Sequence, residues 1–124
     1  MEVGNIYNYE DRLVRFAGET ILFSRNLSND FESDYYRKQL IRSSGSSALN
    51  YGEAQGTVTQ KDFINKMALV SKELKESKTT LKILEYIGQE EDKKRGWLFK
   101  EVQELISIAS KMILNKQSLQ STSK

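Results

Sequence analysis

Basic side chains recur in this sequence at intervals that would place several of them on one side of a helix. Four lysines lie between residues 72 and 82, and three basic residues are consecutive at 93–95. A row of cations can bind the phosphates of a nucleic acid, with an affinity that falls as the salt concentration rises. The candidate phosphate contacts are Arg37, Lys38, Lys72, Lys75, Lys78, Lys82, Lys93, Lys94 and Arg95.

The alternative is a solvated helix face on which opposite charges one turn apart offset each other. Such pairs are mixed here, because Lys72 and Glu76 attract whereas Lys78 and Lys82 repel. The repulsion between Lys78 and Lys82 would be relieved by an anion from solution. Both hypotheses, a nucleic-acid contact and a solvated face, therefore remain open.

A row of polar and small residues occupies the spacing that apolar residues normally have on a buried helix face. Five of them follow at intervals of four, three, four and three, with an arginine beside them: Gln39, Ser43, Ser46, Asn50, Glu53 and Arg42. One hypothesis is a polar network near residues 55–58 that recognises a partner. The other, which we favour, is structural. Small side chains let a neighbouring helix approach closely, while Asn50 and Glu53 satisfy the backbone of the turn.

The sequence contains no histidine and no cysteine, and these two absences exclude several classes of chemistry. Serine–histidine–aspartate triads, cysteine nucleophiles, zinc fingers and Glu-x-x-His di-metal sites each need one of these residues. A glycine-rich phosphate loop is also missing from the sequence. We therefore expect a protein that is not an enzyme, with no catalytic residue, no metal ligand and no cofactor.

The chain has no proline and is rich in Lys, Glu, Leu and Gln, a composition that favours helices. Apolar residues recur every three or four positions, and clusters of Gly, Asn, Ser and Asp divide the chain into four predicted helices. Their ranges are about 9–27, 32–54, 59–87 and 90–115. Thr59 is the expected N-cap of the third helix and Gly88 its expected left-handed C′ residue. Trp97 could stack on a base, but we expect it in the core or at an interface.

Short connections between successive helices favour antiparallel neighbours. The predicted fold class is therefore all-α, an antiparallel up-down-up-down four-helix bundle without strands. A single domain would span residues 1–116, followed by a polar, frayed tail at 117–124. Further apolar residues widen the row of the first predicted helix, and the fourth carries a second row, so that its apolar face is wider than one core needs.

The formal net charge is only +2, so the overall charge permits nucleic-acid contact without requiring it. No apolar run approaches the roughly 20 residues of a membrane span, and the first residues lack the pattern of a secretory signal. Together with the absence of cysteine, these features make the cytoplasm the expected location and predict no contact with a membrane.

The run from Lys38 to Ala54 resembles the signature of the 23S rRNA intervening-sequence proteins, also called the four-helix-bundle protein family. The matching positions are its Gln-Leu and Arg-Ser pairs, the serine three residues on, the asparagine and the final Glu-Ala. Residues 61–66 and 71–77 are similar to the start and middle of that family's third helix. The resemblance extends over about residues 9–114 and implies a four-helix bundle that assembles as a ring-like homopentamer.

The same family includes the accessory variability protein of diversity-generating retroelements, a basic pentamer that binds a reverse transcriptase and nucleic acid. The resemblance therefore implies a non-enzymatic, oligomeric accessory of nucleic acid or of a ribonucleoprotein. Its partners would be further copies of itself, RNA or DNA, and a reverse transcriptase. The alternative is a structural or protein-interaction module with no nucleic-acid role.

Overall fold

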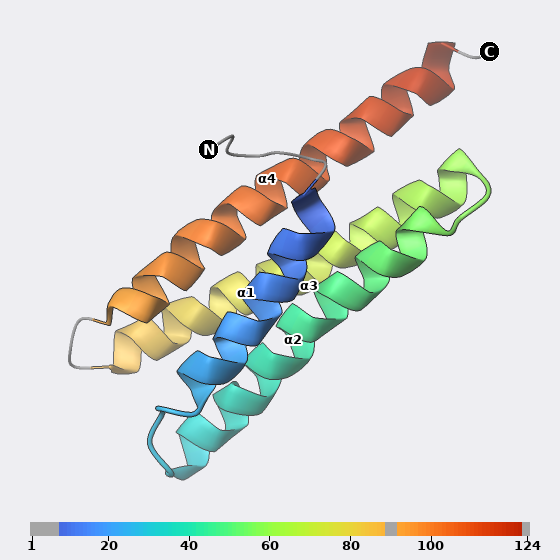
Figure 1. The fold of residues 1–124 in the computed structure, drawn as a ribbon. Coiled ribbons are helices and arrows are strands. Elements are labelled where there is room, and N and C mark those ends of the chain that lie inside the picture. The colour runs from blue at the N-terminus through green and yellow to red at the C-terminus, as the bar shows by residue number, and fades with distance from the viewer. Residues whose placement is uncertain (1–7, 89–91, 123–124) are drawn as a thin grey trace.

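The computed structural model describes residues 8–88 and 92–122, and these residues form four helices. In chain order they are α1 (Tyr9–Ser24), α2 (Phe31–Gln55), α3 (Gln60–Ile87) and α4 (Lys93–Thr122). Successive helices run in opposite directions and pack together, and α4 also contacts α1, which closes the bundle (Figure 1). No strand occurs in the described ranges, so the predicted all-α four-helix fold is confirmed.

Side-chain caps begin three of the helices. Asp30 accepts the N–H of the residue three positions on at 2.9 Å at the start of α2, and Thr59 does the same at 3.0 Å for α3. Asp92 accepts the N–H of the second residue of α4 at 2.9 Å. Such caps satisfy N–H groups that have no partner in the first turn. The prediction of Thr59 as an N-cap is confirmed, whereas the predicted start at residue 90 lies outside the described residues.

Gly88 ends α3 in a different conformation from the predicted one. Its φ of −79° and ψ of 143° are those of an extended residue, so the expected left-handed conformation is wrong. A β-carbon at Gly88 would lie 3.1 Å from the carbonyl oxygen of Leu84 and 3.2 Å from a guanidinium nitrogen of Arg95. Glycine is therefore used here for the close approach of neighbouring groups, and not for a positive φ.

The end of α4 also differs from the prediction, because the helix continues past residue 115 to Thr122. Residues 116–122 contain neither glycine nor proline, so no residue in this stretch breaks the backbone hydrogen-bond ladder. The segment predicted as a frayed tail is therefore helical as far as Thr122, and its last two residues lie outside the described part.

One row of side chains from each helix packs in the core, as the spacing predicts. In α2, serines stand at many of the positions that apolar residues occupy in the other helices. Ser43 and Ser44 are completely buried and connect α2 to both neighbours. The hydroxyl of Ser43 lies 2.6 Å from that of Ser77 in α3, and the hydroxyl of Ser44 lies 2.7 Å from that of Thr20 in α1. These buried groups have partners across both contacts, which supports the structural interpretation of the serines.

Tyr9 connects the start of α1 to two other helices. Its ring packs edge-on against that of Tyr51 with centroids 4.9 Å apart, and its hydroxyl donates to the carbonyl of Leu105 at 2.6 Å. Burial of the phenol, reinforced by Tyr51, raises the pKa of Tyr9 well above its ordinary value, because an ionised phenolate would lose its hydration.

We expect Tyr9→Phe to change how stability depends on alkaline pH. Since the pKa of Tyr9 is raised in the folded state, the contribution of its neutral form is complete below about pH 10 and is lost above it, by up to about 1.4 kcal/mol per pH unit. At neutral pH the variant should be less stable by about 1 kcal/mol, because one hydrogen bond is gone. Urea unfolding at several pH values should show this difference shrinking and then reversing above pH 10. A difference that stays constant across this range would contradict the burial of Tyr9.

Candidate nucleic-acid interface

The charged side chains of α3 separate onto two sides of the helix. Glu73 and Glu76 are bound by the guanidinium of Arg42 in α2, at 3.2 Å in the case of Glu73. Glu76 therefore pairs with Arg42 and not with Lys72, so the pair predicted from its i,i+4 spacing is wrong. The acidic groups at the middle of α3 are used in its contact with α2, and Lys72 and Lys75 are left without them.

Lys72, Lys75 and Lys82 lie on the exposed side of α3, and we call this line the basic stripe. Their separations of three and seven residues place them above one another along the helix. None of the three has a carboxylate of any described residue within ion-pair distance. Like charges this close repel one another, so the stripe is a surface whose charge an anion from solution can offset.

Lys78 lies at the edge of the basic stripe and is half-buried. Its ammonium group is 5.9 Å from the centre of the Phe99 ring in α4, at the outer limit of a cation–π contact. Beside the stripe, a shallow hollow between α3 and α4 is lined by Lys72, Lys75 and the apolar side chains of Ile113 and Leu114, among others. A ligand on the stripe would therefore meet both cations and apolar surface.

Arg37 has a structural role at the loop between α1 and α2. Its guanidinium donates to the carbonyls of Ser24 at 3.1 Å, Leu27 at 3.0 Å and Ser28 at 2.8 Å. It also binds the carboxylate of Asp34 at 3.1 Å. Because these donors are used inside the protein, Arg37 holds the loop and is a poor candidate for a phosphate contact.

Two further lysines that the sequence predicts as phosphate contacts are paired with carboxylates. Lys38 lies 3.2 Å from Asp34, and Lys94 binds Glu19 of α1. The hydrogen bond from Lys38 lowers the pKa of Asp34, and that from Lys94 lowers the pKa of Glu19, because a cationic donor favours the charged carboxylate. A phosphate would have to compete with these partners.

Lys93 and Arg95 lie at the start of α4, next to the end of α3. With Lys100 they line a second hollow, which also contains the carboxylates of Glu85 and Asp92. Lys93 is exposed and Arg95 is half-buried. This hollow extends the basic surface from α3 toward α4. The carboxylates of Glu85 and Asp92 offset part of its positive charge.

Asn50 and Glu53, the last two residues of the polar row, bind groups within α2 and on α3. Asn50 donates from its amide to the carbonyl of Ser46 at 2.9 Å and to its hydroxyl at 3.2 Å, and Glu53 binds Lys66 of α3. The expected network around residues 55–58, and the expected role of Asn50 and Glu53 in satisfying that turn, are therefore wrong. Gln39 is half-buried on α2, at the start of the row.

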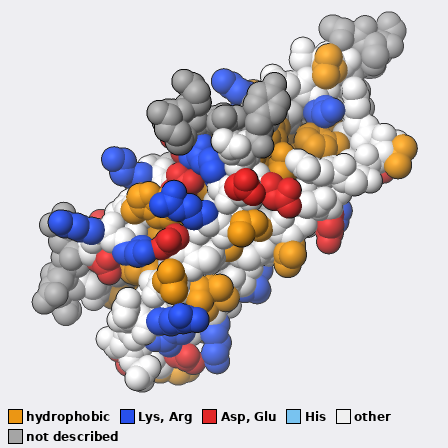
Figure 2. All heavy atoms as spheres, in the orientation of Figure 1, with side chains coloured by type: hydrophobic (Ala, Val, Ile, Leu, Met, Phe, Trp, Pro, Cys, Tyr) orange, Lys and Arg blue, Asp and Glu red, His pale blue; other side chains and the backbone are white. Residues whose placement is uncertain are grey.

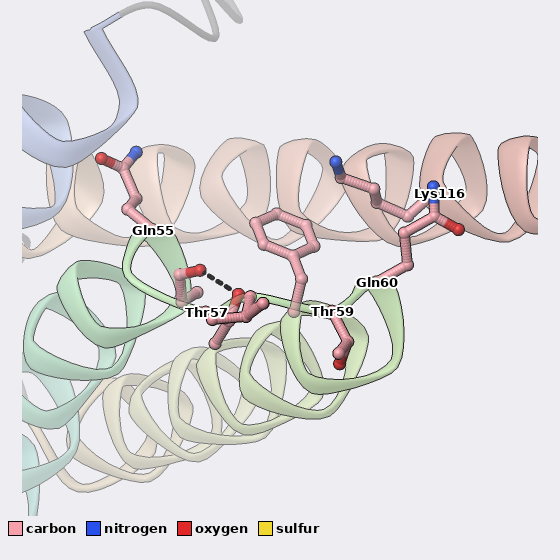
Figure 3. Close-up of a pocket in the computed structure, with 8 residues that line it drawn as sticks. Gln55, Thr57, Thr59, Gln60 and Lys116 are labelled. Atoms are coloured by element: carbon pink, nitrogen blue, oxygen red, sulfur yellow. Dashed lines mark hydrogen bonds between the residues drawn. The ribbon is translucent and has the colours of Figure 1, made fainter.

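The turn between α2 and α3 satisfies its own backbone. The hydroxyl of Thr57 donates to the carbonyl of Ala54 at 2.6 Å, and its N–H bonds to the same carbonyl at 3.2 Å. Figure 3 shows the small pocket between this turn and α4, with Lys116 across from Thr57 and Thr59. The ammonium of Lys116 lies 5.0 Å from the centre of the Phe63 ring. Among the described residues that line this pocket, Lys116 alone is charged, so these residues offer no acid–base pair for catalysis.

Three glycines lie within helices on the outer side of α1 and α2. Gly45 and Gly52 are two turns apart on α2. Gly18 of α1 lies at the level of Gly45, because the helices are antiparallel and Thr20 pairs with Ser44. A β-carbon at any of the three glycines would meet nothing within 4 Å.

Packing within the subunit therefore does not require glycine at these positions. Glycine inside a helix also lowers the stability of the helix by roughly 1 kcal/mol relative to alanine, so a contact outside the subunit would explain its use. Large apolar side chains lie exposed near them, including Leu49, which is 72% exposed, and Val14, which is 57% exposed. On the side of the molecule drawn in Figure 2, hydrophobic side chains gather along α1 and α2 among charged ones. We call this surface the glycine face; its members are Val14, Gly18, Ile21, Gly45, Leu49 and Gly52.

Residues 10–113 match the family model described as 23S rRNA-intervening sequence protein. The chain belongs to this family. The resemblance found in residues 38–54 is thereby confirmed. One solved structure with the same fold is a protein of unknown function from the S23 ribosomal protein family of Bacteroides thetaiotaomicron, with a TM-score of 0.76 and 23% sequence identity. The match covers 85% of the present chain and 97% of the other. No curated protein matches the chain.

This member of the 23S rRNA-intervening sequence protein family also contains an ion-pair cluster that the sequence did not reveal. The guanidinium of Arg12 in α1 binds Glu101 at 2.9 Å and also binds Glu104, both in α4. The side chains of Arg12 and Glu101 are only 12% and 14% exposed. No signal in the sequence connects residues this far apart, because the pairing depends on how α1 and α4 are placed along each other.

Trp97 is half-buried against the core, with the guanidinium of Arg15 4.8 Å from its ring centre. The expectation that Trp97 serves packing is confirmed. Within residues 8–88 and 92–122, no three His, Cys, Asp or Glu side chains are grouped so as to hold a metal ion. No helix in the same ranges combines the length and apolarity that crossing a membrane requires.

Proposed function

We propose that this family member is a non-enzymatic, oligomeric helical bundle that binds nucleic acid, as an accessory to RNA or DNA or to a ribonucleoprotein. The observation that carries the proposal is the basic stripe. Several other cations of the chain are bound to carboxylates or carbonyls, whereas Lys72, Lys75 and Lys82 have no such partner among the described residues.

Ten residues separate Lys72 from Lys82, so the stripe extends about 15 Å along α3. Phosphates follow one another every 3.4 Å or so along a stacked strand, and flexible lysine side chains can reach several of them over this length. The contacts of such a row with phosphates are mainly electrostatic. The protein should therefore bind nucleic acids of many sequences, with an affinity that falls strongly as the salt concentration rises.

We expect the purified protein to bind single-stranded and hairpin RNA or DNA at low salt. If each protomer neutralises four phosphates of a single strand, affinity should fall about 50-fold between 50 and 200 mM salt. In Lys72→Gln/Lys75→Gln/Lys82→Gln, the slope of log affinity against log salt should become shallower by about 2. Fluorescence anisotropy at the two salt concentrations measures both effects.

The matched control is Arg25→Gln/Lys61→Gln/Lys111→Gln, which loses the same number of charges from exposed positions outside the stripe. It should keep most of the salt dependence. Equal losses in the two triple variants would show that net charge alone governs binding. If the unmodified protein does not bind RNA or DNA at 50 mM salt, the proposed function is wrong.

We also propose that several copies of the chain associate through the glycine face, in the homopentamer that the family resemblance implies. Glycines within a helix allow another backbone to approach closely, and the open space at Gly18, Gly45 and Gly52 is compatible with a neighbour outside the subunit. The same face favours the second candidate function, a protein-interaction module, if a different protein covers it.

A further inference from the structure

Tyr86 is an aromatic side chain left almost entirely in solvent, with 91% of its surface exposed. It lies in the last turns of α3, and it has no ring contact or hydrogen bond with a described residue. Most large apolar side chains of α3 are at least partly buried, and a tyrosine ring usually buries much of its surface. A ring this exposed is available to stack against a planar group from another molecule.

The position of Tyr86 connects it to the basic stripe. Lys72, Lys75, Thr79, Lys82 and Tyr86 follow at intervals of three, four, three and four, which is the spacing of one helix face. All five are exposed. The line is about 21 Å long, the length of about six nucleotides of a stacked strand. This spacing is a feature of the sequence itself, whereas the exposure of Tyr86 depends on the fold.

The surface between the last turns of α3 and the start of α4 also carries cations. The neighbouring residue, Glu85, lies at the edge of the hollow that Lys93 and Lys100 of α4 also line. The other carboxylate of that hollow, on Asp92, accepts two backbone N–H groups at the start of α4, at 2.9 and 3.1 Å. A strand on the stripe would therefore have Lys93 and Lys100 beside it across this hollow, while Asp92 is engaged as a helix cap.

We propose that Tyr86 stacks on an unpaired base of a single-stranded nucleic acid whose phosphates contact the basic stripe. This inference rests on the proposed nucleic-acid function and names its substrate class. A tyrosine ring stacks on any base, so the contact is tolerant of sequence. It distinguishes strands by pairing state, because the bases inside a duplex are already stacked and are not open to the ring. Lysines supply the contact to the backbone, and Tyr86 supplies the preference for a single strand.

The test compares three fluorescent ligands with equal numbers of phosphates: a thymidine oligonucleotide, an abasic strand and a blunt duplex. Tyr86→Ala should weaken binding of the thymidine strand by about 5- to 150-fold, the range found for loss of one base–aromatic stack. The same variant should bind the abasic strand and the duplex as the unmodified protein does. Tyr86→Phe, which keeps the ring without the hydroxyl, should bind all three ligands normally.

Two further outcomes separate this inference from the proposed function. If Tyr86→Ala binds the thymidine strand as tightly as the unmodified protein, stacking by Tyr86 is wrong while phosphate binding by the stripe stands. If the unmodified protein binds none of the three ligands at 50 mM salt, both proposals fail. The triple lysine variant serves as the reference, because it should weaken binding of all three ligands. Circular dichroism checks that each variant keeps its helices.

Discussion

Arg12→Ala should destabilise the protein by about 3 kcal/mol, one of the two largest effects we expect from a single substitution. The guanidinium of Arg12 connects α1 to Glu101 and Glu104 of α4, in a site where Arg12 and Glu101 are mostly buried. Removing one partner of a buried pair costs about 3–5 kcal/mol, because the other charge stays buried without compensation. The lower end applies here, since Glu101 keeps 14% exposure and Glu104 keeps 34%.

Urea unfolding followed by circular dichroism measures this loss, at one fixed protomer concentration because an oligomer's stability depends on concentration. The control is Arg12→Met combined with Glu101→Met, which removes both charges and retains much of the volume. Replacing a whole buried pair by apolar side chains is often neutral, so the double variant should recover most of the loss. A cost below about 1 kcal/mol for Arg12→Ala would place this cluster among ordinary surface ion pairs.

The rows of apolar residues could be predicted from the sequence because each depends only on spacing within one helix. Leu13, Phe16, Leu74 and Leu105 each belong to a row with this spacing, and all are fully buried. The serines of α2 were also identified as small residues at a close helix contact, which Ser43 confirms through its bond to Ser77.

Contacts between helices could not be predicted in the same way, because they depend on how far one helix is shifted along another. Spacing within α3 predicts a pair between Glu76 and Lys72, whereas in the structure Arg42 reaches Glu76 from α2. The sequence predicts Arg37 as a phosphate contact, because the carbonyls that it binds become its neighbours only when the loop folds back on α2. The basic stripe therefore follows from the sequence and the fold together: spacing aligns the lysines, and packing against α2 removes the carboxylates.

Gly45→Phe should dissociate the proposed homopentamer while leaving the fold of each subunit intact. Within the subunit, a β-carbon at Gly45 meets nothing within 4 Å, and phenylalanine has a higher helix propensity than glycine. If Gly45→Phe keeps the helical circular dichroism of the unmodified protein, a loss of assembly comes from a contact outside the subunit. In a closed ring of subunits, each interface joins two different surfaces of neighbouring copies. If the glycine face is one of these surfaces, a phenylalanine side chain on it is present at every interface and disrupts each of them.

Light scattering after size-exclusion chromatography measures the mass. The proposed homopentamer of 14.3 kDa protomers predicts about 72 kDa for the unmodified protein, against 14.3 kDa for the variant. Gly96→Phe is the matched control, because Gly96 is also helical with nothing within 4 Å, but lies on α4. That control should keep the mass of the unmodified protein.

Three results would change this interpretation in different ways. Gly45→Phe assembling normally would show that copies associate through another surface. Dissociation of both glycine variants would show a general effect of a new aromatic side chain. An unmodified protein that stays monomeric would leave the glycine face open, with Leu49 and Val14 exposed, and would favour a different protein as its partner. Because the basic stripe lies on α3 and the glycine face on α1 and α2, RNA or DNA binding by the Gly45→Phe monomer would show whether one subunit suffices for the strand.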